Sequence, residues 1–290
     1  MSNKILVLNL LSAFLLFCAC TSSTSHQGER PVITVSIEPM RFLAQSIADT
    51  IFDIECMVPE SNNPETYEPL PSQIANISRS KAYLRIGPIG FEQTWMNRLQ
   101  AIAPDMEIID ATKGIDYIHG HIHHIGHSHT NSIDPHVWTS PKNIRLIAKN
   151  ICNALIKLSP TDSLFFQEKL KKLDSLIIET DDYIRQTLSQ GADSTFLIYH
   201  PTLSYFARDY RLHQLCVEED GKEPSPAHLR SLIDDCHRLG TRIIFVQQQF
   251  DTRHAEIIAK QTGCRLVSIN PLSPDWAHEM KHIATELAHK

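Results

Sequence analysis

Several features that would indicate common classes of protein are missing from this 290-residue sequence. Its seven cysteines include no CxxC pair, so a zinc site built from thiolates is not indicated. Basic residues are not in excess: 27 lysines and arginines face 33 aspartates and glutamates, and the net charge of −6 argues against a nucleic-acid binder. Beyond the first twenty residues, no run is long and apolar enough to span a bilayer. With 42% hydrophobic residues, the chain can nevertheless build a core.

The N-terminus has the pattern of an export signal. Lys4 precedes an apolar run, Ile5 to Phe17, that is too short for a transmembrane helix. The run leads to Ala19-Cys20, and a small residue before a cysteine resembles a bacterial lipobox, in which that cysteine is acylated. We therefore expect a signal peptide over residues 1–19, a lipid anchor on Cys20, a tether over residues 20–30 and a mature protein outside the cytoplasm. The alternative is a plain signal peptide cleaved nearby.

After Pro31, short β-rich runs alternate with segments of helical period. The expected strands are Val32–Ile37, Ile54–Val58, Ala82–Ile86, Glu107–Asp110, Thr195–Tyr199, Gln214–Glu218, Arg242–Val246 and Arg265–Ile269. The expected helices include Phe42–Ile51, Phe91–Ile102, Asn143–Leu158, Ala227–Leu239 and Ala255–Thr262. Apolar strands separated by helices predict parallel sheets covered on both faces. We therefore expect an α/β fold of two lobes, residues 31–158 and 191–290, each with a mostly parallel four-stranded sheet.

The segment between the lobes predicts one long, rigid helix over residues 159–190. Ser159 and Pro160 form a helix start, and Gly191 supplies a stop. The apolar residues on one face are Phe166, Leu170, Leu173, Ile177, Ile184 and Leu188. A helix of this length is a stiff connector, so the lobes should move little against each other.

Candidate metal ligands follow the expected strands. Glu65 lies in a loop after the second strand, His136 follows the fourth, and His200 and Asn270 end two strands of the second lobe. Ligands in open parallel sheets bind beyond the carboxyl ends of the strands, so these four side chains could converge between the lobes. Taken singly, each has a plainer explanation: a histidine beside a proline is often a hydrogen-bonded turn residue, and Glu65 could be a solvated acid.

Histidine is concentrated in one short stretch. Of sixteen histidines, six lie between residues 119 and 129: His119, His121, His123, His124, His127 and His129. The stretch has no helical or strand period, and several imidazoles on a loop can capture zinc in many arrangements. The hypothesis is an accessory loop that scavenges zinc or senses its occupancy. The alternative is a solvated loop whose metal binding is incidental.

Five motifs together carry a family resemblance: PETYEPLPSQI near residue 64, DPHVWTSPKN at 134, YHPTLSYFARDYRL at 199, EPSPAHLRSLI at 223 and SINPL near the end. In this order they are similar to the cluster A-I (cluster 9) solute-binding proteins of metal ABC importers, and most similar to the zinc branch. The resemblance implies two α/β lobes joined by a rigid helix, with a metal ion in the cleft. It also implies His136 and His200 as ligands, a monomer in the periplasm, and delivery of Zn²⁺ to a membrane permease without catalysis.

Two positions depart from the family pattern. Residue 65 is glutamate where the family commonly has histidine, and residue 270 is asparagine where it commonly has aspartate. Two imidazoles and a carboxylate are a sound zinc set, completed by water or the Asn270 carbonyl. More oxygen donors shift the preference toward Mn²⁺ or Fe²⁺, which are less favoured alternatives. Two other functions compete: a zinc hydrolase using the same His/Glu cluster, and a lipid-anchored adhesin.

Overall fold

Two four-stranded parallel sheets form the framework of the computed structural model, which describes residues 30–119, 133–218 and 222–289. The first sheet contains β1 (Val32–Ile37), β2 (Asp53–Val58), β3 (Ser80–Arg85) and β4 (Glu107–Asp110), in the order β2-β1-β3-β4. The second contains β5 (Thr195–Ile198), β6 (His213–Cys216), β7 (Ile243–Gln247) and β8 (Arg265–Ile269), in the order β6-β5-β7-β8. All eight predicted strands are present, with ends within two residues of those expected, and the predicted fold class is confirmed.

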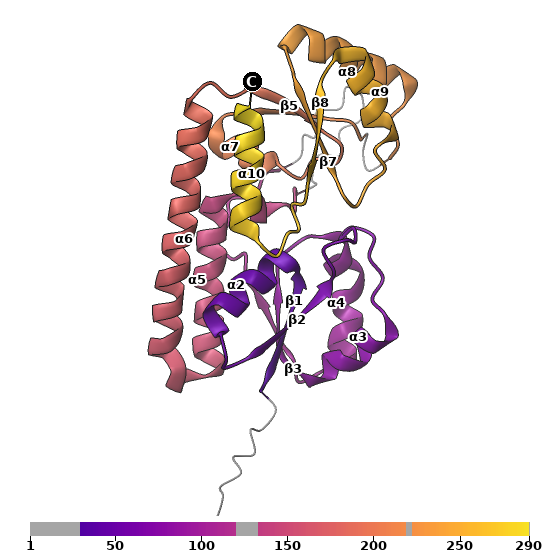
Figure 1. Cartoon of the computed structure of the whole chain (residues 1–290). Coiled ribbons are helices and arrows are strands. Elements are labelled where there is room, and N and C mark those ends of the chain that lie inside the picture. The colour runs from indigo at the N-terminus through magenta and orange to yellow at the C-terminus, as the bar shows by residue number, and fades with distance from the viewer. Residues whose placement is uncertain (1–29, 120–132, 219–221, 290) are drawn as a thin grey trace, which may run out of the picture. The chain divides into compact units, whose positions relative to one another are not determined.

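Helices cover both sheets (Figure 1). In the first lobe they are α2 (Glu38–Ala48), α3 (Pro71–Asn76), α4 (Gly90–Ile102) and α5 (Pro141–Leu158). After the long helix α6 (Ser163–Ser189) come α7 (Ser204–Tyr210), α8 (Pro226–Leu239), α9 (Arg253–Thr262) and α10 (Trp276–Ala288). Short 3-10 turns lie at Ile77–Arg79, Val137–Thr139 and Pro160–Asp162. The sequence interpretation did not include α3, α7 or α10, and α2 begins four residues before the expected Phe42.

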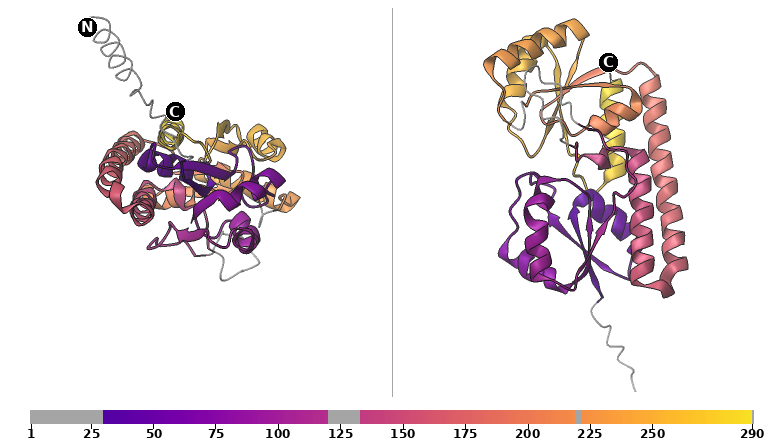
Figure 2. Two further views of the ribbon diagram at one scale, coloured as in Figure 1. Left: turned by 90° about the horizontal axis from the view of Figure 1, so that it is seen from below. Right: turned by 180° about the vertical axis from the view of Figure 1, so that it is seen from behind.

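The connector is one long helix, as predicted, but it is shorter than expected and starts later. Ser159 precedes the 3-10 turn Pro160–Asp162, and its hydroxyl donates to the Asp162 carboxylate. The α-helix itself begins at Ser163 and ends at Ser189, about 40 Å at 1.5 Å per residue. Gly191 adopts a φ of 104°, which a residue with a side chain rarely adopts, and so ends the helix. Seen from the front and from behind, α6 runs beside α5 and alongside both sheets (Figures 1 and 2).

One hydrophobic core runs through both lobes. The fully buried β1 and Phe166 of α6 share a cluster of buried side chains with Phe245 of β7 and Trp276 of α10. Helices α5 and α10 both pack against α6. Two tryptophans add hydrogen bonds: the Trp138 indole donates to the Pro271 carbonyl at 2.9 Å, and the Trp276 indole donates to the Trp138 carbonyl at 2.8 Å. Residues 31–290 accordingly form one compact unit.

Some sequence predictions concern residues that are not described. The signal peptide, Cys20 and the tether up to residue 29 lie outside the described residues, as do His121, His123, His124, His127 and His129. The proposed lobe boundaries stay predictions. Within the described ranges, no helix combines the length and apolarity that crossing a membrane requires.

Candidate metal site

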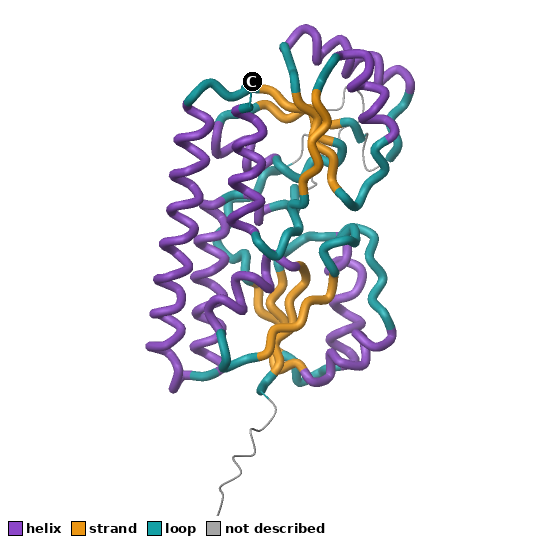
Figure 3. Tube along the Cα trace, in the orientation of Figure 1, coloured by secondary structure: helices purple, strands orange, loops and turns teal. Residues whose placement is uncertain are grey.

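The predicted ligands lie at the carboxyl edges of the two sheets. In each sheet the second strand lies on one side of the first strand, and the third and fourth strands lie on the other side. The direction in which strands are added therefore reverses between β1 and β3 and between β5 and β7. Such switch points leave a crevice beyond the strand ends. The loops that follow the strands gather between the two sheets (Figure 3). His200 follows β5 at one switch point, and His136 lies in the loop before the 3-10 turn Val137–Thr139.

His136 is fixed by the aspartate two residues before it. One Asp134 oxygen accepts both the His136 backbone amide and the His136 ring Nδ1, each at 2.9 Å. The Tyr205 hydroxyl donates to the Asp134 carbonyl at 2.7 Å and accepts the Ile118 amide at 3.1 Å. Because Tyr205 belongs to α7, the second lobe holds the segment that carries His136. The His136 residue as a whole is 4% exposed.

His200 has an equivalent carboxylate partner. Its Nδ1 lies 2.7 Å from an oxygen of Glu218, which is buried just beyond the end of β6. Gln247, at the end of β7, accepts the His200 amide at 3.3 Å and donates its side-chain amide to the His200 carbonyl at 2.5 Å. The strands on both sides of β5 therefore hold His200 in place.

The Nε2 atoms of His136 and His200 face each other at 3.3 Å. A carboxylate at each Nδ1 requires the proton on that nitrogen, so a neutral ring presents a lone pair at Nε2. Two facing lone pairs need a shared proton or a cation between them. Two nitrogens bound to one tetrahedral Zn²⁺ at about 2.05 Å lie about 3.3 Å apart. The observed separation therefore fits two ligands of one zinc ion.

Charge favours a cation at this pair. Burial alone would raise the pKa of Asp134, but His136 lowers it by charge and by hydrogen bonding. Burial alone would lower the pKa of His136, but Asp134 raises it, and the carboxylates of Glu65 and Glu218 add to the rise. The same negative field that stabilises imidazolium would stabilise a divalent ion.

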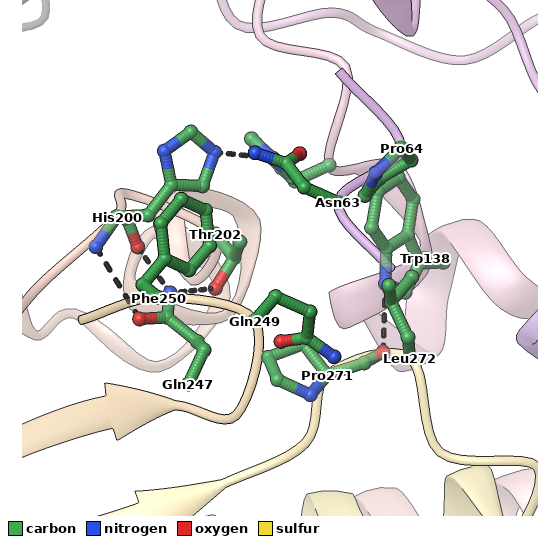
Figure 4. Close-up of a pocket in the computed structure, with 11 residues that line it drawn as sticks. Asn63, Pro64, Trp138, His200, Thr202, Gln247, Gln249, Phe250, Pro271 and Leu272 are labelled. Atoms are coloured by element: carbon green, nitrogen blue, oxygen red, sulfur yellow. Dashed lines mark hydrogen bonds between the residues drawn. The ribbon is translucent and has the colours of Figure 1, made fainter. Parts of the chain in front are cut away.

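Aromatic rings enclose the two imidazoles. Phe250 stacks on His200 with ring centroids 4.8 Å apart and an interplanar angle of 16°, while Trp138 meets His136 edge-on at 5.2 Å. Figure 4 shows His200 and Phe250 on one side of a pocket and Asn63, Pro64 and Trp138 on the other. The rings restrict the imidazoles to orientations in which their Nε2 atoms meet.

Glu65 lies near the pair without joining it. One carboxylate oxygen accepts the Gly90 amide at 2.8 Å, and the other, Oε1, is buried without a hydrogen-bond partner. Among the described residues, no three His, Cys, Asp or Glu side chains are grouped closely enough to hold a metal ion. The structure thus brings His136 and His200 together and leaves Glu65 with one unused acceptor.

Asn270 connects the two lobes. Its side-chain oxygen accepts the Gln249 amide at 3.2 Å, and its amide nitrogen donates to the Glu60 carboxylate at 3.2 Å. Gln249 also donates to the Glu60 carbonyl. In this state Asn270 links a loop of the first lobe to the end of β8.

His119, the first residue of the histidine-rich stretch, forms a β-bridge. His119 pairs with Ile133 in an isolated antiparallel β-bridge, and His119 is exposed. His119 and Ile133 are therefore adjacent in the structure.

Helix α10 contains His278-Glu279-Met280-Lys281-His282, an HExxH spacing, so the expectation that the sequence has no such spacing, which would count against a hydrolase, is wrong. In zinc metalloproteases the two histidines of this motif bind the metal and the glutamate acts on its water. Here Glu279 is buried and accepts the Asn270 backbone amide at 2.7 Å, whereas His278 is exposed. The motif supports the turn that carries Asn270.

Four residues of the site were not among the predicted ligands: Asp134, Glu218, Gln247 and Phe250. Asp134 stands in the DPH motif, two residues before His136. An acidic residue so close to a candidate ligand could have been predicted as the hydrogen-bond partner that orients its ring. Glu218 and Gln247 reach His200 only because β5 lies between β6 and β7, an order that sequence does not give.

Comparison with known proteins identifies the family. The family model described as "Zinc-uptake complex component A periplasmic", ZnuA, matches residues 33–289. This chain belongs to the ZnuA family. It is 24% identical over 276 residues to the high-affinity zinc uptake system protein ZnuA of Bacillus subtilis, covering 90% of this chain and 86% of that protein. A crystal structure of ZnuA superposes with a TM-score of 0.83 at 32% identity, covering 90% of this chain and 98% of the other.

A further relative is a lipoprotein. The metal ABC transporter substrate-binding lipoprotein FimA of Streptococcus parasanguinis is 24% identical over 262 residues, covering 86% of this chain and 82% of FimA. Membership of the ZnuA family confirms the family predicted from the motifs. It also confirms the predicted function, a metal-binding component of an ABC importer with zinc as the expected ion.

Proposed function

We propose that this chain captures one Zn²⁺ between its lobes, through His136 and His200, and delivers it to the permease of an ABC importer. The observation that supports this most is the pair of Nε2 atoms 3.3 Å apart, each on a ring oriented by a carboxylate. Imidazoles held in this way are the ligands that zinc prefers, and the carboxylates raise their basicity.

Glu65 is the proposed third ligand. Its free oxygen is buried, and its charge already acts on His136. Two neutral imidazoles and one carboxylate would leave the bound ion with a net charge of +1. Asn270 would either bind the ion through its side-chain oxygen, as a fourth ligand, or hold the loops around the ligands without binding the ion. The first role requires it to exchange its hydrogen bond with Gln249 for the metal.

The proposed cycle has binding and release but no catalytic step. The chain would act as a monomer in the periplasm, held to a membrane by a lipid on Cys20. The histidine-rich stretch, His119 to His129, would add weak zinc capture near the site. Zinc should bind more tightly than Mn²⁺ or Fe²⁺, in line with their intrinsic order of affinity.

A zinc titration of the metal-free protein tests the assignment. One tight site per chain is expected, and the double variant His136→Ala, His200→Ala should lose it. His213→Ala, which removes an exposed histidine from β6, is the matched control and should bind as the wild type does. Tight binding that survives in the double variant would refute the ligand assignment, and zinc-dependent hydrolytic turnover would favour the hydrolase.

A further inference from the structure

Two cysteines of the second lobe lie in contact beside its sheet. Cys236 is in the last turn of α8, and Cys264 immediately precedes β8. The two residues are 1% and 7% exposed and belong to the same hydrophobic cluster. The two thiols are hydrogen-bonding partners. Their spacing in the sequence gives no sign of this pairing.

The main chain around the two cysteines is held by Thr241. The Cys264 thiol donates to the Thr241 carbonyl at 3.1 Å, and the Thr241 amide donates to the Cys236 carbonyl at 3.0 Å. Pairing of β7 with β8 begins next to this point, with Ile243 opposite Arg265. The end of α8 and the start of β8 are therefore fixed side by side, with both cysteines in the same buried cluster.

Two other thiols of the protein have different partners. The Cys56 and Cys216 thiols donate to the carbonyls of Val58 and Tyr199, at 3.3 and 3.1 Å, and burial raises the pKa of both. Cys236 and Cys264 instead share a hydrogen bond with each other. Once one thiol of such a pair loses its proton, it is in the thiolate form that attacks a disulfide.

We propose that Cys236 and Cys264 form a disulfide as the exported chain folds. The proposal rests on the extracytoplasmic location proposed above, because only an oxidising compartment keeps such a bond, and it is independent of the metal ligands. The bridge would enclose the segment that carries Gln247 and Phe250, and so would stabilise the side of the pocket that holds His200.

The oxidant would be a thiol–disulfide oxidoreductase of the compartment. The thiolate of one of the two cysteines attacks one sulfur of the oxidant's disulfide, which forms a mixed disulfide and releases one thiolate of the oxidant. The other cysteine then loses its proton to water and attacks the sulfur of the first, which releases the second thiolate. Two electrons pass from the cysteine pair to the oxidant, which ends as a dithiol. Because both sulfurs are buried in the folded lobe, this exchange precedes completion of the fold.

Thiol mapping of the full chain, exported with its own leader, tests the proposal. The purified protein is unfolded in guanidinium with iodoacetamide and no reductant, then digested and analysed by mass spectrometry. A peptide pair linked through Cys236 and Cys264 is expected, which separates on reduction, while Cys56, Cys152 and Cys216 are alkylated. Reduction should lower the Tm of the metal-free wild type and of Cys152→Ala by roughly 5–10 °C, and leave the Tm of a Cys236→Ala, Cys264→Ala variant unchanged.

Alkylation of both Cys236 and Cys264 in the exported protein would overturn the proposal. The zinc titration of the same preparation keeps the two proposals apart. Zinc bound through the histidines with both thiols free would refute the disulfide alone, whereas a disulfide without a histidine-dependent zinc site would refute the proposed ligands alone.

Discussion

Gly90 lies directly against the main chain of Glu65. A Cβ placed on Gly90 would be 2.3 Å from the Glu65 carbonyl oxygen, closer than real Cβ contacts allow. The Gly90 amide donates to the Glu65 carboxylate at 2.8 Å, and the next amide, of Phe91, donates to the Pro64 carbonyl at 2.8 Å. The first turn of α4 thus determines where the proposed third ligand lies.

Gly90→Ala should therefore weaken zinc binding. The added methyl meets backbone, which cannot rotate away, so the Glu65 loop must shift. We expect a loss of about 1–3 kcal/mol in the free energy of unfolding and roughly 10- to 100-fold in zinc affinity. Titration and denaturant unfolding measure both, and Thr94→Ala, exposed in the same helix, is the control. Unchanged zinc affinity in a destabilised Gly90→Ala protein would exclude Glu65 from the ligand set.

Asp134→Asn should alter the acid–base behaviour of His136. Since Asp134 raises the pKa of His136, the metal-free variant should have a lower His136 pKa, measurable by NMR titration of the ring protons. In the wild type the ion pair stabilises the fold below the ordinary histidine pKa, and this contribution is lost as pH rises through the raised value. The variant should lack that extra stability at acidic pH.

The same substitution should reduce zinc affinity at pH 8 by roughly 10- to 100-fold, because the ring loses its orienting partner. Asp105→Asn, an exposed substitution in the same lobe, should change neither property. A His136 pKa that does not move in Asp134→Asn would show that this pair has no electrostatic role.

Glu92 should make the first lobe less stable as pH rises. Glu92 is 4% exposed, its carboxylate accepts the amides of Ile86 and Gly87 at 2.7 and 3.0 Å, and burial raises its pKa from 4.5 to about 7. Between these values the folded protein binds more protons than the unfolded chain, so stability falls with pH, by at most about 3 kcal/mol.

Glu92→Gln should remove this pH dependence. Denaturant unfolding of the metal-free protein at pH 5 and pH 8 measures it, with the exposed Glu179→Gln as the control. An equal loss of stability with pH in wild type and Glu92→Gln would mean that Glu92 is ionised throughout. The same turn, residues 86–91, also contains Gly90, which holds the Glu65 carboxylate. The substitution therefore also tests how stable the part of the protein that positions Glu65 is.

The sequence was sufficient to predict the strands and the long helix, which depend on local patterns of apolar residues. Apolar runs predicted every strand, and the 3.6-residue period predicted α6, because both follow from which side chains must be buried. His136 and His200 were predicted from their motifs. Glu218 was expected only as a strand residue, since its contact with His200 depends on β6 pairing with β5. The link between Asn270 and Glu60 likewise depends on how two loops from distant parts of the chain meet.

The continuous core beneath the two sheets has a kinetic consequence. Because Phe166, Phe245 and Trp276 belong to one packed cluster, the lobes cannot swing apart without exposing it to water. The barrier to ion exchange should therefore lie in the loops around the pocket, where Asn270 and Gln249 close onto Glu60. Bound zinc would have a long residence time in free solution, and its fast discharge would need a docking partner that breaks these few polar contacts.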